Sequence, residues 1–394
     1  MPWLDQLKRE HSARINENLW RERKILESPQ GREVSVDGRS YLNFCSNDYL
    51  GLANHPQLVS AAAAALQASG TGSGASHLVC GHMEQHHSLE QEIARFVGAE
   101  KAIVFSTGYM ANLAIPQTFL GRNDLIIEDR LNHASLIDAG RFCPAEMERY
   151  PHLDWRAAEK LLSQSRANRK LVTTDGVFSM DGDIAPVTQL QEACAQQDAL
   201  LLVDDAHGFG VLGNTGIGTL EESGIQIGGG VLLLGTLGKS AGSFGAFVAG
   251  DAIYIESLVQ FARPYIYTTA LPPSVVAASR AAIQIIQTEP QRRQSLKRNI
   301  EYFRRAIENS CLDLANSTTP IQPLILKSSD AALRAAQHLK QNGILVTAIR
   351  PPTVPVGTAR LRITLSAAHT TEDIDRLADS LTSTAMLQIV GGDA

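Results

Sequence analysis

Short apolar runs alternate with stretches of helical periodicity from about residue 55 to residue 250. The runs lie at 102–105, 124–128, 170–175, 200–205, 231–235 and 245–250. Strands that are apolar throughout are buried on both faces, because helices cover both sides of a parallel sheet. The pattern therefore predicts an α/β fold in which a mostly parallel sheet is flanked by helices.

The N-terminal residues have a different pattern. Residues 2–24 predict a polar amphipathic helix. Its apolar positions are Trp3, Leu4, Leu7, Ile15 and Leu19. Apolar and polar residues then alternate over 32–44 on either side of Asp37-Gly38, a pair typical of a tight β-hairpin turn.

The pattern changes again after a long helical stretch at 274–310. Strands are predicted at 320–326, 344–350 and 360–365, and helices at 329–342 and 371–389. These elements predict a smaller C-terminal α+β domain. We therefore expect an N-terminal helix and hairpin segment (1–52), a large domain (53–289) and a small domain (290–394).

Composition narrows the class of protein. The 394 residues carry a net charge of −6, which argues against a nucleic-acid partner because such proteins usually have a basic surface. The five cysteines are scattered without a CxxC pair, as in proteins of the reducing cytosol. The N-terminus is too charged for a signal peptide, and no apolar run reaches the ~20 residues that span a bilayer. We expect a soluble cytoplasmic protein without a membrane partner.

The segment LLLVDDAHGFG (200–210) carries the first candidate chemistry. It runs from a buried strand into Asp204, Asp205 and His207, at the sheet edge where open α/β folds bind ligands. The alternative is a pair of loop-capping carboxylates beside a surface histidine. These residues could also bind a metal ion, but no other group of ligand residues nearby in the sequence would complete the coordination shell.

The segment GTLGKSAGSFGAF (235–247) places Lys239 among small residues after another strand. It is not a phosphate-binding Walker loop, because position 233 is Leu where that motif needs Gly. A lysine in such a pocket is costly unless it is paired or reacts covalently. The alternative is a solvated loop lysine.

Three further strand ends carry polar residues. His133 precedes a predicted helix, Gly108 opens another helix whose N–H groups suit a phosphate, and Asp175 and Ser179 follow the strand at 170–175. Each residue alone is best explained as a cap or turn residue. Their convergence with Lys239 on one sheet edge instead predicts a catalytic site.

Two other motifs carry less weight. His82 and His86 are four residues apart, but the glutamate is at the wrong offset for an HExxH zinc motif. A capped, solvated helix start is the better interpretation, and we expect no metal. The glycine-rich run 70–75 lacks the preceding strand of a dinucleotide-binding fingerprint.

Taken together, these segments resemble the pyridoxal-phosphate (PLP) α-oxoamine synthases, which have the aspartate-aminotransferase fold, or PLP-dependent transferase fold type I. The resemblance covers nearly the whole chain. It is carried by residues 41–56, 70–82, 129–140, 177–187, 203–213, 236–245, 265–273 and 349–364. The last of these segments and the N-terminal helix favour the branch of the family that serves biotin biosynthesis.

The resemblance implies roles for the residues at the strand ends. Lys239 would bind PLP covalently and act as the catalytic base. Asp204 would pair with the pyridine nitrogen and keep it protonated, so that the ring acts as an electron sink. His133 would stack on the ring and take part in catalysis, His207 would bind the phenolic oxygen, and Ser179 would assist it.

The resemblance also implies a phosphate site and a dimer. Gly108, Tyr109 and Thr236 would surround the PLP phosphate. Thr268 or Thr269 would reach the phosphate of a second subunit, so a homodimer with shared active sites is expected. The resemblance does not distinguish between the two threonines.

Substrate-binding roles follow in the same way. Asn47 and Arg350 resemble the ligands of the amino-acid carboxylate, and His133 and Thr353 belong to the same substrate-binding set. Arg21 would bind the distal carboxylate of the acyl chain, although a solvated helix face explains it equally well. Asp175 stands where the family commonly has Glu, so its role stays open.

The implied substrates are L-alanine and pimeloyl-CoA or a pimeloyl-carrier protein, joined in a decarboxylative condensation. A related synthase that uses glycine and a short acyl-CoA is the nearest alternative. A PLP aminotransferase and a PLP-fold regulator are more distant ones, and the ~24 residues before the hairpin leave no room for the DNA-binding domain of a regulator.

Overall fold

The computed structural model describes residues 2–391. The chain divides into two compact units. The large unit consists of Leu50–Ser179 and Asp183–Gln294, and the small unit of Met1–Tyr49, Met180–Gly182 and Ser295–Ala394.

The large unit is built on a seven-stranded sheet of order β3-β9-β8-β7-β6-β4-β5. The strands are β3 (Lys101–Phe105), β4 (Leu125–Asp129), β5 (Glu146–Tyr150), β6 (Lys170–Asp175), β7 (Leu200–Asp204), β8 (Val231–Thr236) and β9 (Ala246–Gly250). Strands β5, β4, β6, β7 and β8 are parallel, whereas β9 is antiparallel to both β8 and β3. The predicted mostly parallel sheet is confirmed.

The sequence pattern missed the edge strand β5. Its side chains alternate between exposed and partly buried, with Glu146 and Glu148 exposed. A search for continuous apolar runs cannot find such a strand, because only one of its faces is covered.

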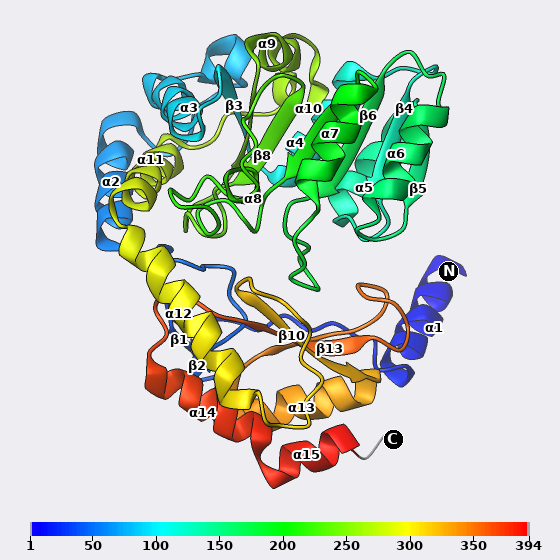
Figure 1. Cartoon of the computed structure of the whole chain (residues 1–394). Coiled ribbons are helices and arrows are strands. Elements are labelled where there is room, and N and C mark those ends of the chain that lie inside the picture. Colours follow the sequence, from blue (N-terminus) through cyan, green and yellow to red (C-terminus); the bar gives the residue numbers. More distant parts are fainter. Residues whose placement is uncertain (1, 392–394) are drawn as a thin grey trace. The chain divides into compact units, whose positions relative to one another are not determined.

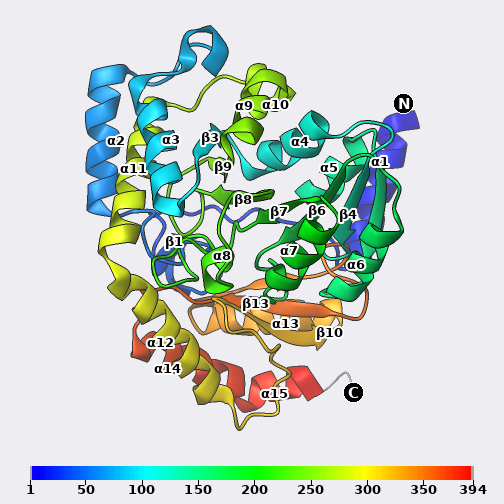
Figure 2. The same ribbon diagram turned by 45° about the horizontal axis from the view of Figure 1, so that its top comes forward.

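Helices cover both faces of this sheet. Helices α4 (Gly108–Phe119) and α5 (Ala134–Phe142) lie on one face, and α6 (Trp155–Gln164) and α7 (Val187–Gln196) on the other (Figures 1 and 2). The remaining helical segments of this unit are α2 (Pro56–Ser69), η1 (His77–Gly81), α3 (Glu84–Val97), α8 (Thr219–Glu222), α9 (Ala252–Phe261), α10 (Arg263–Ile266) and α11 (Pro273–Thr288). The side chains of the central strands, such as Ile127, Leu202 and Leu233, are fully buried. This burial on both faces of the sheet agrees with the continuous apolar runs in the sequence.

The small unit contains two three-stranded sheets, β1-β2-β11 and β10-β13-β12. The strands are β1 (Glu33–Val36), β2 (Arg39–Asn43), β10 (Ile321–Lys327), β11 (Ile344–Leu345), β12 (Thr347–Ile349) and β13 (Ala359–Thr364). The predicted hairpin is confirmed: β1 and β2 are antiparallel, and Asp37 and Gly38 both have positive φ. The predicted strand at 344–350 is in fact two strands, which pair with different sheets.

Helices α13 (Ser329–Gln341), α14 (Thr371–Thr382) and α15 (Thr384–Gly391) complete this unit, and α12 (Pro290–Ile307) crosses the boundary at residue 294. The predicted helical stretches 274–310 and 371–389 are each divided into two helices. Pro290 begins the second helix of the first stretch, where its missing N–H costs nothing.

The N-terminal segment groups with the C-terminal residues, because β11 pairs in parallel with β2. Residues 180–182 also join the small unit, since Arg360 donates to the Met180 carbonyl (3.2 Å) and Ser317 to the Gly182 carbonyl (3.1 Å). The unit boundaries therefore differ from the sequence-based division at 52 and 289.

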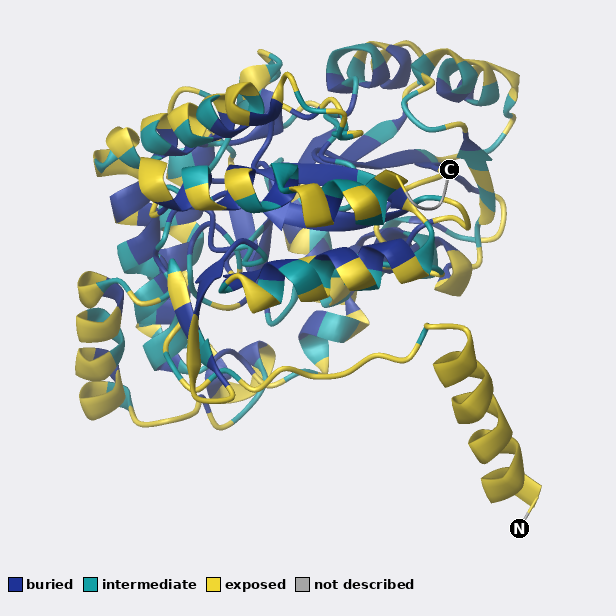
Figure 3. Cartoon of the chain, turned by 90° about the horizontal axis from the view of Figure 1, so that it is seen from below, coloured by how far each residue is buried: buried dark blue, intermediate teal, exposed yellow. Residues whose placement is uncertain are grey.

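Helix α1 (Pro2–Asn16) is shorter than the predicted helix over 2–24, which was wrong beyond Asn16. Asn18 adopts φ 56°, and the Leu19 N–H donates to the Arg14 carbonyl (2.8 Å), an arrangement that ends helices. Every turn of α1 is exposed (Figure 3). No helix within residues 2–391 combines the length and the apolar character needed to cross a membrane.

Candidate active site

The carboxyl ends of β6 and β7 place two acidic residues side by side. Asp175 and Asp204 are paired in the parallel register, and both are buried. Burial and the neighbouring charge of Asp204 hold the pKa of Asp175 well above its usual value. Two ionised carboxylates are therefore unfavourable at this sheet edge unless a cation lies beside them.

Lys239 provides a cationic group at the same edge. It lies in the turn after β8, and its Nζ is 2.8 Å from Nε2 of the buried His207, which follows β7. Asp204, Asp175 and Lys239 are all within electrostatic reach of one another, because the charges of Asp204 and Lys239 both act on Asp175. The structure thus brings Lys239, from the segment 235–247, together with His207 and Asp204, from the segment 200–210.

Asp204 is held by uncharged donors. Its Oδ2 accepts from Asn112 Nδ2 of α4 (2.6 Å), and its Oδ1 accepts from the Ala206 N–H (3.1 Å). Asn112 is completely buried and also donates to Ser135 (2.8 Å). Sequence reasoning missed Asn112, because it lies inside an apolar helix rather than at a strand end.

Asp205 has a different role from Asp204. Its carboxylate accepts from both the N–H (2.6 Å) and the hydroxyl (2.5 Å) of Thr219, and burial raises its pKa to about 7. A Cβ at Gly208 would lie 2.1 Å from Asp205 Oδ1, so only glycine fits there. Asp205 therefore fixes the loop between β7 and α8.

His133 caps helix α5 and is held by Asp175. Its backbone N–H donates to Asp175 Oδ2 (2.8 Å), and its Nδ1 lies 2.7 Å from Ser135 Oγ. Asn132 accepts from the Asp175 N–H (3.1 Å) and donates to the Thr173 carbonyl (2.9 Å). Desolvation lowers the pKa of His133, so its ring is neutral near pH 7. Asp175 thus positions the loop that carries His133.

The start of α4 offers backbone donors. Thr107 is the N-cap, and its hydroxyl accepts from the Met110 N–H (3.2 Å). Gly108 is the first helical residue, and the Tyr109 hydroxyl donates to Asp138.

Thr236, at the end of β8, shapes the turn that holds Lys239. Its Oγ1 donates to the Gly245 carbonyl (3.1 Å) and accepts from the Gly238 N–H (3.3 Å).

Three other predicted positions lie in connecting segments of the large unit. Ser179 is half-buried in the turn after β6. Thr269 is exposed and forms a backbone bridge with Ser76, and Thr268 precedes it.

In the small unit, Arg21 and Arg350 share one neighbourhood. Arg350 donates to the carbonyls of Asn18 and Trp20 (3.0 Å to the latter), and Arg21 donates to Thr353 Oγ1 (3.2 Å). Desolvation and the charge of Arg21 lower the pKa of Arg350. Two guanidinium groups with mutual repulsion favour an anion between them.

Asn47 lies instead beside a cation that sequence reasoning missed. Arg362 of β13 is buried, and it donates to Asn47 Oδ1 (3.1 Å) and to the Tyr49 hydroxyl (3.4 Å). Tyr49 donates to the same Asn47 oxygen (3.2 Å). The alternation of arginine and apolar residues in 359–364 was read only as a strand, although a buried arginine is unusual enough to mark a candidate site.

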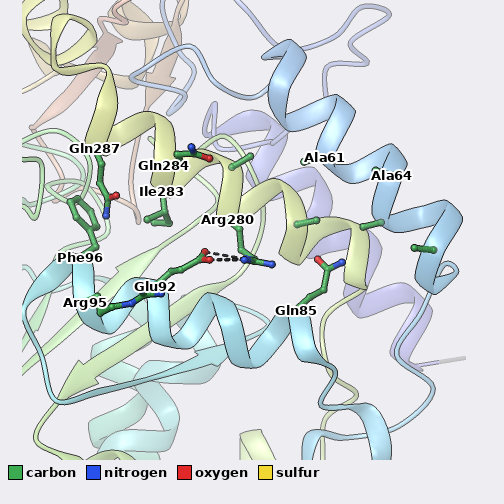
Figure 4. Close-up of a pocket in the computed structure, with 14 residues that line it drawn as sticks. Ala61, Ala64, Gln85, Glu92, Arg95, Phe96, Arg280, Ile283, Gln284 and Gln287 are labelled. Carbon is green, nitrogen blue, oxygen red and sulfur yellow. Dashed lines mark hydrogen bonds and ion pairs between the residues drawn. The ribbon is translucent and has the colours of Figure 1, made fainter.

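A cavity of about 760 Å³ lies between α2, α3 and α11 of the large unit (Figure 4). Arg280 and Glu92 point toward one another there and form a charge pair with an N···O distance of 2.6 Å. None of the predicted site residues lines this cavity, within the part of the chain that the structure describes.

Comparisons with known proteins identify the family of the chain. Residues 39–381 match the model of the family described as aminotransferase class I and II. The 8-amino-7-oxononanoate synthase of Cellvibrio japonicus is 54% identical over 94% of this chain and 93% of its own. The enzyme of the same name from Methylococcus capsulatus is 52% identical over 92% and 94%.

Solved structures are similar over most of the chain. A lysine-to-alanine variant of serine palmitoyltransferase from S. paucimobilis, with a bound PLP-myriocin aldimine, superposes with a TM-score of 0.92 at 30% identity, over 99% of both chains. The 8-amino-7-oxononanoate synthase of Francisella tularensis gives a TM-score of 0.75 at 31% identity, over 90% of this chain and 97% of its own. The chain therefore belongs to the aminotransferase class I and II family, and within it to the 8-amino-7-oxononanoate synthases.

Proposed function

We propose that this protein condenses L-alanine with a pimeloyl thioester, either pimeloyl-CoA or a pimeloyl-carrier protein. The products are 8-amino-7-oxononanoate, the free thiol and CO2, and the reaction serves biotin biosynthesis. The observation that carries the proposal is the contact between Lys239 Nζ and His207 (2.8 Å) beside Asp204, in a chain 50–54% identical to synthases of that name.

PLP is the cofactor of this family, and the donor set of the large unit fits it. Asp204 is a buried carboxylate whose donors, Asn112 and the Ala206 N–H, are uncharged, so a pyridinium would stabilise it. Lys239 offers an amine for the aldehyde, and the N-terminus of α4 at Gly108 offers N–H groups for the phosphate.

We assign the surrounding side chains to the cofactor on the same basis. Tyr109 and Thr236 would bind the phosphate with Gly108. His133 would lie against the ring, where its neutral imidazole stacks without adding charge. His207 and Ser179 would bind the phenolic oxygen.

Bound PLP supplies an electron sink for the negative charge that develops at Cα of the amino acid. Lys239 then removes and returns the proton at that carbon, and His207 orients its amine through the 2.8 Å contact. Asp204 keeps the proton on the pyridine nitrogen, because the carboxylate would otherwise be buried without a cationic partner.

The small unit supplies substrate recognition in this proposal. Arg350 and Asn47 bind the carboxylate of L-alanine, and the contact between Asn47 and Arg362 adds Arg362 to this set. Arg21 and Thr353, which are hydrogen-bonded to each other (3.2 Å), bind the acyl substrate.

A homodimer with shared active sites completes the proposal. The bridge between Ser76 and Thr269 brings together two segments whose large apolar side chains are exposed, including Val79 (77% exposed) and Tyr267 (71% exposed). Large apolar side chains that are exposed side by side on adjacent segments indicate an interface with another subunit. Thr268 or Thr269 would then reach the phosphate bound by the other subunit.

One assay tests the function. The purified protein is incubated with PLP, either L-alanine or glycine, and a panel of acyl-CoA thioesters, and the products are identified by mass spectrometry. We expect 8-amino-7-oxononanoate from L-alanine and pimeloyl-CoA. Preferential condensation of glycine with acetyl-CoA or succinyl-CoA would contradict the proposal and assign the chain to a related synthase.

A further inference from the structure

Four histidines gather where η1 leads into α3. The ring centroids of His77 and His82 are 5.1 Å apart, those of His82 and His86 5.8 Å, and those of His82 and His87 6.0 Å. Glu90 lies three residues after His87 on α3, so the two side chains share one face of the helix. The proposed reaction uses none of these residues.

Three of these side chains can share one ion. His82, His87 and Glu90 each offer a ligand atom, and the three atoms lie within 4.8 Å of one another. The distance from His82 Nε2 to Glu90 Oε2 is 3.9 Å. Zinc bonds of about 2.0–2.2 Å at tetrahedral angles separate donor atoms by roughly 3.3–3.6 Å, so small side-chain movements would close the site.

Neighbouring groups orient each of the three side chains. Glu90 Oε1 accepts from the Val104 N–H (3.0 Å), which leaves Oε2 directed toward His82. His82 Nδ1 is 2.8 Å from His77 Nδ1, and His87 Nε2 is 2.8 Å from the Gln91 amide. The contact between His82 and His77 is of the kind that fixes the ring orientation of metal-binding histidines, because Nδ1 of His82 can donate to His77 and leave its Nε2 to the ion.

His86 is not a ligand of the ion. Nδ1 of His86 accepts from the Met83 N–H (3.1 Å), and its Nε2 lies 2.8 Å from the Leu271 carbonyl. His86 therefore caps α3, as the sequence predicted, but it is buried rather than solvated. The sequence analysis compared His82 with His86 and so missed the pairing of His82 with His87.

The cluster is open to solvent. The side chains of His82 and Glu90 are 29% and 15% exposed, so an ion can enter from solvent. Metal binding displaces any proton from the imidazole nitrogens and the carboxyl group that act as ligands.

We propose that His82, His87 and Glu90 bind one divalent transition-metal ion of the Zn²⁺ type, with water as the fourth ligand. Two nitrogens and one carboxylate oxygen form the ligand class that such ions prefer over Mg²⁺ or Ca²⁺. This inference replaces the expectation, drawn from the sequence, that the protein has no metal site.

Bound metal would join the start of α3 to the segment that precedes it. That segment reaches Ser76, which bridges to Thr269, and Ser73 donates to the Leu271 carbonyl (2.5 Å). The metal would therefore stabilise the region that carries Thr268 and Thr269, without touching the catalytic groups.

Cobalt binding tests the site directly. The full-length holoenzyme, without a polyhistidine tag, is titrated with Co²⁺ and followed by the visible absorption of the tetrahedral ion. We expect one Co²⁺ per chain that Zn²⁺ displaces, and a loss of affinity of about tenfold or more in His87→Ala. His87 is exposed, so this variant should fold, and its condensing activity should match that of the unchanged protein.

Two further variants sharpen the result. Glu90→Gln should lose the same Co²⁺ spectrum, whereas His11→Ala, on the exposed helix α1, should retain it. Zn²⁺ should raise the melting temperature of the unchanged protein and of His11→Ala but not of His87→Ala. An identical Co²⁺ spectrum and affinity in the unchanged protein and His87→Ala would overturn the proposal.

Discussion

Asp204 and Asp205 are neighbours in the chain, yet their hydrogen-bond partners differ in kind. Thr219 satisfies both oxygens of Asp205 within the loop, whereas Asp204 accepts from the Asn112 amide and from the Ala206 N–H. A single sequence motif thus supplies one residue that holds the loop and one that is available to a cofactor.

Lys239→Ala should abolish the proposed condensation, because the same amine is needed for covalent cofactor binding and for proton transfer. We expect a loss of at least about 10³-fold in kcat, together with loss of the yellow colour of the holoenzyme. Steady-state assays and absorption spectra measure both effects. Lys160→Ala on the exposed side of α6 serves as the control, and full activity of the Lys239 variant would refute the mechanism.

Arg350→Lys and Arg362→Lys test the amino-acid site. A guanidinium binds a carboxylate through two parallel hydrogen bonds, which an ammonium cannot form. We expect the KM for L-alanine to rise about tenfold in each variant, with a smaller change in kcat. Arg334→Lys on α13 is the control. An unchanged KM in Arg350→Lys would leave Arg362 as the carboxylate ligand.

Arg21→Ala tests recognition of the acyl chain. Only the distal carboxylate distinguishes a pimeloyl chain from a monocarboxylic chain of similar length. We expect kcat/KM to fall about tenfold for pimeloyl-CoA and to change little for heptanoyl-CoA. Equal losses on both substrates would show that Arg21 does not bind this carboxylate.

At the scale of elements, His152 ties the end of β4 to the turn after β6. It contacts Asp129 (3.0 Å) and Asp183 (3.1 Å). Burial alone would lower its pKa, but these hydrogen bonds and charges raise it from 6.5 to about 9. Because the folded pKa is the higher one, the stabilisation is complete below about pH 6.5 and is lost as the pH rises through 9.

Urea unfolding at pH 6 and pH 9.5 should reveal this contribution. The free energy of unfolding of the unchanged protein should fall by roughly 1–3 kcal/mol more over this range than that of His152→Gln. Parallel pH dependence of the two proteins would show that the two ion pairs contribute nothing measurable.

The elements that the sequence predicted correctly are those with a local signal. Continuous apolar runs marked β4, β6, β7 and β8, and the positive-φ pair Asp37-Gly38 marked the hairpin. Strand β5 and the break between β11 and β12 depend on which strand lies alongside, which no local pattern records. The same applies to the site: Lys239 and His133 follow strands, whereas Asn112 and Arg362 became visible only through their contacts.

At the scale of the whole molecule, a mixing experiment tests the shared active sites. Lys239→Ala chains are combined in equal amounts with chains that carry Thr268→Ala and Thr269→Ala, under conditions that exchange subunits. In a mixed dimer, one site receives both intact groups. Since half of the dimers are mixed, about one quarter of all sites should be active.

The controls are the two variants kept separate, which should stay inactive or nearly so. Light scattering before and after mixing establishes the oligomeric state. A fully active monomer, or no recovery despite verified subunit exchange, would contradict a site shared between subunits.

The reversed strand β9 has a consequence for synthesis on the ribosome. Strand β3 lies at the edge of the sheet and pairs with β9, so Lys101 meets its partner Gly250 only after 149 further residues (250 − 101) have been added. At about 5–20 residues per second, this delay lasts roughly 7–30 s. During that time an apolar strand has no partner within its own chain. We therefore expect the nascent polypeptide to need chaperones or rapid translation between these two strands, and slow codons placed there should lower the yield of folded protein.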